Sequence, residues 1–351
     1  MKKMLLKYVF IVATVVLFLK VDAQDIHFSQ YNASPLLLNP ALAGMNACDY
    51  RVYANFRTQW VTVSEGNTYR TFSGGADMSV GKVTKYNSFA GIGISFFSDQ
   101  AGAINFNSNR VDLSFAYHFM LNRKATQQLS IGIQGSFNYT SLDPSKATFD
   151  SQYNPLTGQM DSSLAGEMFG RSHVIFGDAS VGFLYSGTFR NKSNIYFGFA
   201  LSHVNQPKIS FYPGGINNSF SGEERLNMKI TLHGGGSVPF SNRISALPNF
   251  LVLLQGSAYE FNVGCSFKAI VGNVSTSNTA IYGGIQYRGL FDAVILNTRI
   301  DYKGFTCGLS YDINISKLLP ASNSVGAPEI SLMYQGCHRK KPTPGHCPVM
   351  F

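Results

Sequence analysis

The feature that most constrains the fold is a two-residue alternation in which one face is apolar and the other is small and polar. Residues 131–139 read IGIQGSFNY, and similar alternation recurs over 111–119, 261–267 and 305–314. A period of two defines β-strands. The alternating segments run for about 10 to 14 residues with aromatic side chains near their ends, which suits tilted strands that cross a bilayer. Soluble strands are typically about half as long.

Composition narrows the choice further. Charged residues make up 13% of the chain, against roughly 25% in soluble domains, while Phe (28), Tyr (18) and Gly (34) are abundant. Beyond the N-terminus no segment is apolar for the 18 residues that a spanning helix needs. We therefore predict an all-β fold, a transmembrane antiparallel up-and-down β-barrel of about 14 strands. An exported soluble all-β protein is the alternative.

The strand count and the loops support one topology. The two longest predicted connections, 141–172 and 206–221, follow the fifth and seventh strands, whereas connections after even strands are short. Long outer loops and short periplasmic turns are typical of such barrels, and an even count places both chain ends in the periplasm. The expected strands span residues 49–63, 66–80, 86–98, 103–120, 126–140, 173–188, 193–205, 222–239, 247–259, 260–272, 278–288, 291–302, 304–315 and 328–335.

The first 23 residues have the pattern of a secretory signal peptide. Cations at Lys2, Lys3 and Lys7 precede an apolar run, and Ala23 ends a small-residue cleavage pattern. A membrane anchor is the alternative, although the run is short for a spanning helix. Cleavage would remove four cations and one anion, leaving 28 − 4 = 24 cations and 19 − 1 = 18 anions, a net charge of +6. This modest basicity, without clustered basic and aromatic stripes, predicts no nucleic-acid partner.

Three further parts are expected after the signal peptide. Residues 24–48 form an N-terminal periplasmic segment or plug, 49–336 form the outer-membrane barrel, and 337–351 form a basic tail containing Pro and Cys. The segment 24–48 does not resemble a membrane strand, because Pro35 and Pro40 cannot donate to a strand ladder. It either packs into the mouth of the barrel or presents a docking surface.

At these residues the sequence resembles the PorP/SprF family of type IX secretion system membrane proteins of Bacteroidetes. The resemblance rests on Phe28-Ser29-Gln30-Tyr31, on Leu38-Asn39-Pro40-Ala41 with Ala43-Gly44, on Arg51-Val52 followed by Asn55-Phe56-Arg57-Thr58-Gln59-Trp60, and on the closing segments Leu309-Ser310-Tyr311-Asp312 and Pro328-Glu329-Ile330-Ser331-Leu332. It implies an outer-membrane barrel, in contact with outer-membrane lipid, that works beside the type IX translocon and its periplasmic ring and lipoproteins. It also implies that the barrel holds the C-terminal domain of a large surface adhesin.

The family motif supplies the candidate site. The residues expected to bind a partner or to form the plug are Phe28, Ser29, Gln30, Tyr31, Pro35, Leu38, Asn39, Pro40, Ala41, Gly44, Arg57, Gln59 and Trp60. Trp60 is expected to lie in the aromatic belt at the membrane interface, with a partner contact as the alternative. The resemblance brings no catalytic residue, no cofactor and no metal.

The five cysteines of the mature chain cannot all pair within it. Cys265 and Cys307 occupy lipid-facing positions on strands that are not neighbours, so we expect them to stay unpaired. In the tail, Cys337 and Cys347 flank a short loop and are expected to form a disulfide; a zinc or copper site with the adjacent histidines, or a flexible tail, are the alternatives. Cys48 would then be left over.

The sequence contains few residues that indicate an enzyme. His118 falls on a lumen-facing position near Asp112, as in barrel enzymes that act on lipids, but a structural histidine is the simpler interpretation. The chain has no Gly-x-Ser-x-Gly, His-Glu-x-x-His or phosphate-loop motif. We therefore expect no enzymatic activity. The expected function is docking or anchoring of secreted adhesins for type IX secretion, and the alternative is a porin or substrate-selective channel.

Overall fold

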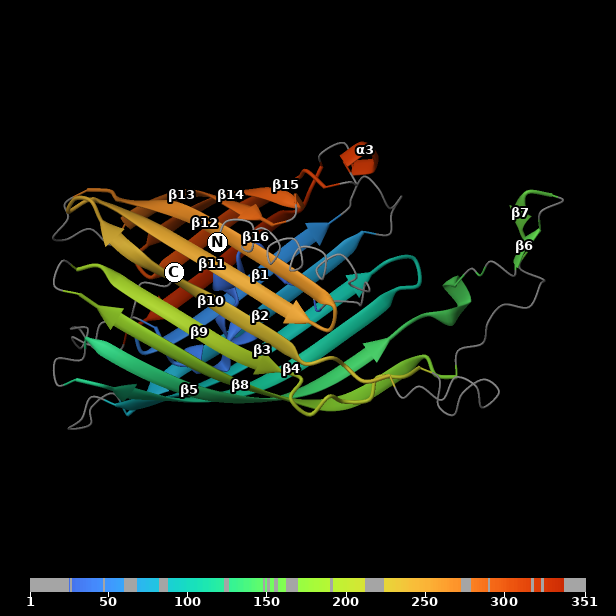
Figure 1. Cartoon of the computed structure of the whole chain (residues 1–351), viewed down its shortest axis with the longest axis horizontal. Helices are drawn as coiled ribbons and strands as arrows, with labels where there is room; N and C mark the ends of the chain where they lie inside the picture. Colours follow the sequence, from blue (N-terminus) through green and yellow to red (C-terminus); the bar gives the residue numbers. More distant parts are fainter. Residues whose placement is uncertain are drawn as a thin grey trace, which may run out of the picture.

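The computed structural model closes the chain into a β-barrel around an N-terminal plug (Figure 1). It describes residues 25, 27–46, 48–59, 68–81, 88–122, 126–147, 149, 152–154, 157–161, 170–189, 192–211, 224–272, 279–289, 291–316, 319–322 and 325–337. The predicted signal peptide and Trp60 lie outside these residues.

Within the described residues, fourteen antiparallel strands form one closed barrel in which each strand pairs with its neighbours along the chain and the first pairs with the last. These strands are β1 Tyr50–Gln59, β2 Tyr69–Val80, β3 Phe89–Ala101, β4 Phe106–Met120, β5 Gln127–Ser141, β8 His173–Thr188, β9 Asn194–Ser202, β10 Lys229–Pro239, β11 Ile244–Gln255, β12 Ala258–Ile270, β13 Thr279–Arg288, β14 Ala293–Tyr302, β15 Phe305–Asn314 and β16 Pro328–Gly336. The fold prediction is confirmed.

In β4 the alternation separates an apolar outer face from a polar inner face, as predicted. Leu113 is 64% exposed on the outer wall, whereas Asp112 and His118 are fully buried on the lumen side. Apolar side chains cover the outside of the other strands in the same way, because lipid offers no hydrogen bonds to polar groups. Closing the sheet also removes every unpaired strand edge. None of the helices among the described residues is both long and apolar enough to span a membrane.

The two ends of the barrel differ. At one end the strands are joined by short connections, such as 240–243 and 303–304; at the other end lie the long connections 142–172, 203–228 and 315–327. We call these the short-turn end and the long-loop end. A small hairpin of β6 (Tyr153–Asn154) and β7 (Gln159–Met160) extends away from the barrel at the long-loop end (Figure 1). The helix α3 (Leu319–Ser322) lies at the same end.

Some boundaries differ from the predicted ones. β10 begins at Lys229 instead of residue 222, so the connection before it is longer than expected. The predicted ninth strand begins earlier, because β11 starts at Ile244. In both places the backbone register with the neighbouring strand, and not the local pattern, sets the end of the ladder.

The N-terminal segment fills the lumen with three single turns separated by bends. These are η2 (Tyr31–Ala33), α2 (Pro35–Leu38) and η3 (Pro40–Leu42). Proline stands at the first position of both α2 and η3, where its missing N–H costs no hydrogen bond. The buried apolar core therefore lies between plug and wall. One cluster comprises Tyr31, Leu38, Ala41, Leu42, Met45, Leu184, Tyr196 and Leu251, and a second comprises Leu36, Ala43, Tyr53, Ala116 and Met333.

Candidate functional site

The plug is held by a buried charge cluster around Ser29. The Ser29 hydroxyl donates to Asp312 Oδ2 at 2.7 Å. The same carboxylate oxygen accepts from Arg57 Nη2 and Arg288 Nη2, each at 2.9 Å. Arg57 also donates to the carbonyl of His27. Because Arg57 and Asp312 are at most 5% exposed, their pairing avoids the large cost of leaving a charge alone in the lumen wall.

A second carboxylate on the same side grips the backbone of the plug. Glu329 accepts from the amides of Ser29 and Gln30, at 2.8 and 2.9 Å, and from Asn55 Nδ2 at 2.9 Å. Gln30 Oε1 in turn accepts from the hydroxyl of Ser331 at 2.7 Å. A carboxylate that receives two consecutive backbone N–H groups positions that backbone tightly. The Phe-Ser-Gln-Tyr motif is therefore fixed to β1, β15 and β16.

Asn39 fixes the middle of the plug to the opposite wall. Its side-chain amide donates to the carbonyl of Phe183 at 3.0 Å and lies 3.1 Å from His233 Nε2. Its oxygen accepts from the amide of Ala41 at 2.9 Å and so caps η3. The Asn-Pro pair of the motif thus stops one turn, starts the next and contacts the barrel with a single side chain.

The end of the plug is held at Gly44. Its amide donates to Asp77 Oδ2 at 2.7 Å, and Arg51 pairs with both oxygens of Asp77 at 2.8 and 3.0 Å. Arg51 also donates to the carbonyl of Leu42 at 3.3 Å. Gly44 has a φ of 70°, a region that favours glycine, and a methyl group there would overlap the backbone of Met78 and Gly91. The motif glycine is therefore required by both conformation and space.

Glycines of the lumen wall allow the plug backbone to approach. A methyl group at Gly91 would overlap the carbonyl of Ala43, and one at Gly132 would overlap the backbone at Pro40 and Ala41. The small residues on the predicted lumen face indicate this close approach of another backbone. His118 is part of the same contact, since its Nε2 lies 2.8 Å from the carbonyl oxygen of Ala43.

Asp25 is the first described residue of the plug, and it binds residues at the long-loop end of the barrel. Its Oδ2 lies 2.7 Å from Lys229 Nζ and 2.8 Å from His203 Nε2, and His203 Nδ1 lies 2.7 Å from Asp178. We call Asp25, Asp178, His203 and Lys229 the Asp25 latch. Burial alone would raise the pKa of Asp25, but Lys229 and His203 outweigh it and hold that pKa well below its usual range. Asp178 and Asp25 likewise outweigh burial and raise the pKa of His203, which directly follows β9.

The disulfide prediction was wrong. Cys337 is bonded to Cys48 and not to Cys347, which lies outside the described residues. The physical reason is barrel closure: β1 pairs with β16, Tyr50 lies opposite Gly336, and the residues just outside these two strands therefore meet. The bond joins positions 289 residues apart in sequence. Cys265 and Cys307 are free, as expected.

The structure places the other predicted site residues on one interface. The residues from Phe28 to Gly44 lie in the plug, and Arg57 reaches it from β1. Gln59 ends β1 and is half-buried. Sequence reasoning missed the wall residues that hold the plug, which are Asp77, His233, Glu260, Arg288, Asp312 and Glu329. Their signal was a charge or imidazole at an inward position of a predicted strand, and that pattern does not say what the side chain meets.

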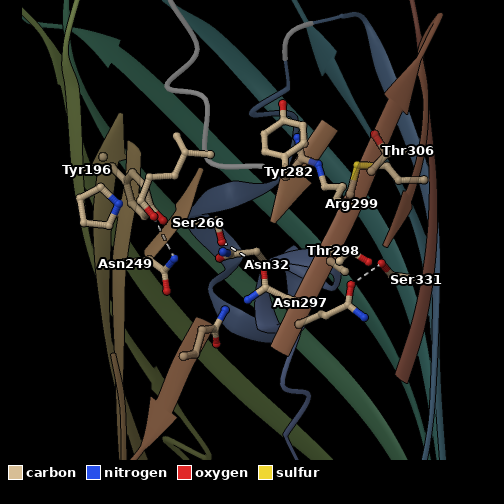
Figure 2. Close-up of a pocket in the computed structure, with 17 residues that line it drawn as sticks. Asn32, Tyr196, Asn249, Ser266, Tyr282, Asn297, Thr298, Arg299, Thr306 and Ser331 are labelled. Atoms are coloured by element: carbon tan, nitrogen blue, oxygen red, sulfur yellow. Dashed lines mark hydrogen bonds between the residues drawn. The ribbon is translucent and has the colours of Figure 1, made fainter. Parts of the chain in front are cut away.

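Two cavities lie on either side of the plug. One of about 110 Å³ faces the short-turn end. Figure 2 shows Asn32 of the plug within it, with Tyr196 and Asn249 on one wall and Tyr282 and Arg299 on the other. The other, of about 240 Å³, lies at the long-loop end next to Asp25.

An apolar outer wall, a polar lumen and a plug anchored by buried charges define a β-barrel membrane protein with a filled lumen. A sequence model described as type IX secretion system membrane protein PorP/SprF matches residues 20–334, so the chain belongs to the PorP/SprF family.

The chain is similar to several solved structures. The Ralstonia pickettii toluene transporter TbuX has 11% identity and a TM-score of 0.50, with 86% of this chain and 92% of that chain covered. The Pseudomonas putida toluene transporter TodX has 10% identity and a TM-score of 0.45, with 90% and 94% covered. A Pseudomonas aeruginosa FadL homologue has 9% identity and a TM-score of 0.45, with 85% and 92% covered. At such identities the likeness concerns the fold alone. No curated protein matches the chain in sequence.

Proposed function

We propose that this chain is an outer-membrane accessory component of the type IX secretion system, which docks secreted surface adhesins and links them to the translocon, the periplasmic ring and its lipoproteins. The observation that carries the proposal is the plug. Family membership supports the secretion system as the setting, and a lumen filled by an anchored segment supports docking over passive conduction.

The strength of the anchoring favours a plug that stays in place. Hydrogen bonds to buried, ion-paired carboxylates hold it near both of its ends, from Ser29 to Asp312 and from Gly44 to Asp77. A hydrogen bond to a charged group typically contributes about 1.5–3 kcal/mol. Spontaneous loss of several such contacts together would therefore be rare, and a steady pore would be absent.

The same wall supports the proposed location, and the two ends of the barrel suggest an orientation. Large apolar side chains such as Leu113 and Ile133 face outward, as lipid contact requires. The short-turn end, which carries the Cys48–Cys337 bond, faces the periplasm in this proposal, and the long-loop end faces outward. A disulfide is consistent with an oxidising compartment. Adhesins would then meet the long-loop end, and ring and lipoprotein components the short-turn end.

Co-purification tests the docking role directly. The full-length tagged protein would be recovered from native outer membranes in mild detergent, and its partners identified by mass spectrometry. We expect translocon or periplasmic ring components together with a large adhesin. As control, an unrelated outer-membrane barrel carrying the same tag is processed in parallel. Recovery of the barrel alone under conditions that preserve the translocon would contradict the proposal.

A porin or selective channel is the second candidate, favoured by the two cavities that flank the plug. Planar bilayer recordings separate the two functions. We expect no steady conductance from the intact protein, and conductance from a variant lacking residues 24–44. Equal, steady conductance from both would favour the channel. We also propose that the protein has no enzymatic activity; lipase or deacylase activity that disappears on His118→Ala would overturn this.

A further inference from the structure

The cavity at the long-loop end has the size of a ligand site. It measures about 240 Å³, larger than the roughly 150 Å³ apolar cavity that suffices to hold a benzene ring. The plug forms its floor through Asp25 and Leu37. Its walls come from β3, β4, β5 and β8, and its cover comes from His203, Ile209, Phe211 and Leu226, which follow β9.

The surface that faces the cavity is mainly apolar, and four phenylalanines contribute to it together with Leu37, Val174, Ile209 and Leu226. Phe97 projects inward from β3, Phe106 from β4 and Phe176 from β8. Phe211 of the long connection packs edge-on against Phe106, with ring centroids 6.3 Å apart. A further aromatic ring can pack against these phenylalanines in the same edge-on or offset geometry. An apolar group of ring size therefore fits this lining.

Most charged groups around the cavity are paired with an opposite charge within the protein, and Asp99 is hydrogen-bonded. Asp25 pairs with Lys229 at 2.7 Å and with His203 at 2.8 Å. Arg110 pairs with Asp112 at 3.0 Å. Asp99 accepts a hydrogen bond from the hydroxyl of Thr71 at 2.7 Å. An ion entering the cavity would have to displace one of these partners, so the lining favours a neutral occupant.

One polar group in the lining is left unsatisfied. Asn138 is 5% exposed, and in the part of the chain that the structure describes its Nδ2 has no hydrogen-bond partner. It lines the cavity from β5, one inward position before Thr140. A buried amide donor without an acceptor is unfavourable, so a ligand that brings an acceptor oxygen would gain from meeting it.

We propose that this cavity binds a neutral, ring-sized apolar group that carries a hydrogen-bond acceptor, the chemistry of a phenol or a tyrosine side chain. The ring would lie among the phenylalanines, and its oxygen would accept from Asn138 Nδ2. The group can come from a free phenolic compound or from the side chain of a polypeptide that enters at the long-loop end. The inference goes beyond docking and holds whether the barrel anchors proteins or conducts solutes.

Fluorine NMR with the full-length protein in lipid nanodiscs tests the site. The probe is 4-fluorophenol, fluorobenzene serves as the ligand without an acceptor, and empty nanodiscs correct for partition into lipid. We expect saturable binding of 4-fluorophenol that is tighter than binding of fluorobenzene by a factor of roughly 3 to 10, the worth of one hydrogen bond. Asn138→Leu should abolish this preference while still binding both rings.

Filling the cavity provides the second test. Ser108 lines the cavity and faces inward, so Ser108→Phe should prevent binding of both probes. Asn109→Phe, one residue further on the outward face of β4, is the matched control and should bind normally. Thr140→Phe is used if Ser108→Phe does not fold. Absence of saturable binding, or binding that survives a folded filling variant, overturns the proposal.

A competition experiment distinguishes the two sources of the group. N-acetyl-tyrosine amide is titrated against bound 4-fluorophenol, with N-acetyl-alanine amide as control. Displacement by the tyrosine derivative alone supports a polypeptide side chain as the occupant. Binding of 4-fluorophenol without displacement by the tyrosine derivative supports a free small molecule. If neither phenol binds, no source remains and the inference fails.

Discussion

The hydroxyl of Ser29 donates a 2.7 Å hydrogen bond to Asp312 Oδ2 and joins residues 283 positions apart in the chain. This contact links the plug to β15, the strand before the last. The same carboxylate balances two arginines of the wall, Arg57 and Arg288. A single oxygen thus serves both the stability of the lumen wall and the position of the plug.

The first prediction concerns this oxygen. Asp312→Ala should destabilise the protein by about 3–5 kcal/mol, because it leaves Arg57 and Arg288 without their shared partner. Ser29→Ala should cost less, about 1.5–3 kcal/mol, and should mainly loosen the plug. Denaturant unfolding in detergent measures the first effect and hydrogen exchange of residues 27–31 the second. Ser98→Ala on the outer face of β3 is the control, and an equal effect there would contradict the assignment.

The second prediction concerns space for the plug. Gly91→Leu should displace the plug, because even a methyl group at this position overlaps the carbonyl of Ala43. Overpacking of this kind typically costs about 1–3 kcal/mol. We expect faster proteolysis of the N-terminal segment and new conductance in bilayers. Gly135→Leu is the matched control, since a Cβ there meets no atom within 4 Å; if both variants conduct alike, Gly91 has no special role.

The third prediction concerns the disulfide. Cys48→Ser should lower stability by about 2–5 kcal/mol, because Cys48–Cys337 closes a loop of most of the chain. The loss should appear as a lower Tm under oxidising conditions, and the reductant-dependent shift of the wild-type protein in gel mobility should vanish. Cys265→Ser is the control, because Cys265 is a free thiol. A mobility shift retained in Cys48→Ser would point to a different pairing.

The fourth prediction concerns pH. The lowered pKa of Asp25 means that its contribution is present above its ordinary value of 3.8 and is lost as the pH falls through the lowered pKa. The raised pKa of His203 means that its contribution is complete below 6.5 and is lost as the pH rises through the raised pKa. The Asp25 latch should therefore be strongest between these two values.

Hydrogen exchange of residues 27–31, corrected for intrinsic rates, measures this dependence. Protection should be greater at about pH 5 than at about pH 9. The variant Asp25→Asn removes the carboxylate that His203 and Lys229 share, so its protection should be lower and should vary less with pH. A wild-type profile that is flat across this range would refute the role of the latch.

Much of the barrel was predictable because its determinants are local. Alternation in residues 111–119 specifies a strand, and the contrast between Leu113 and Asp112 specifies which face meets lipid. The strand number followed from counting such segments. The loop-like character of residues 24–48 followed from Pro35 and Pro40, which cannot belong to a strand ladder.

The contacts that define the site were decided by tertiary structure. The chain shows that Glu329, Asp312 and Asp77 point inward, but only the closed register brings them to the amides and hydroxyl of the plug. The disulfide is the clearest case. Closure of a barrel joins its first and last strands, so Cys48 and Cys337 meet although nothing near either residue in sequence indicates it. The sequence by itself determined the period, the faces and the number of strands, because these depend on neighbouring residues; pairing across the lumen depends on the global register, which only the folded barrel sets.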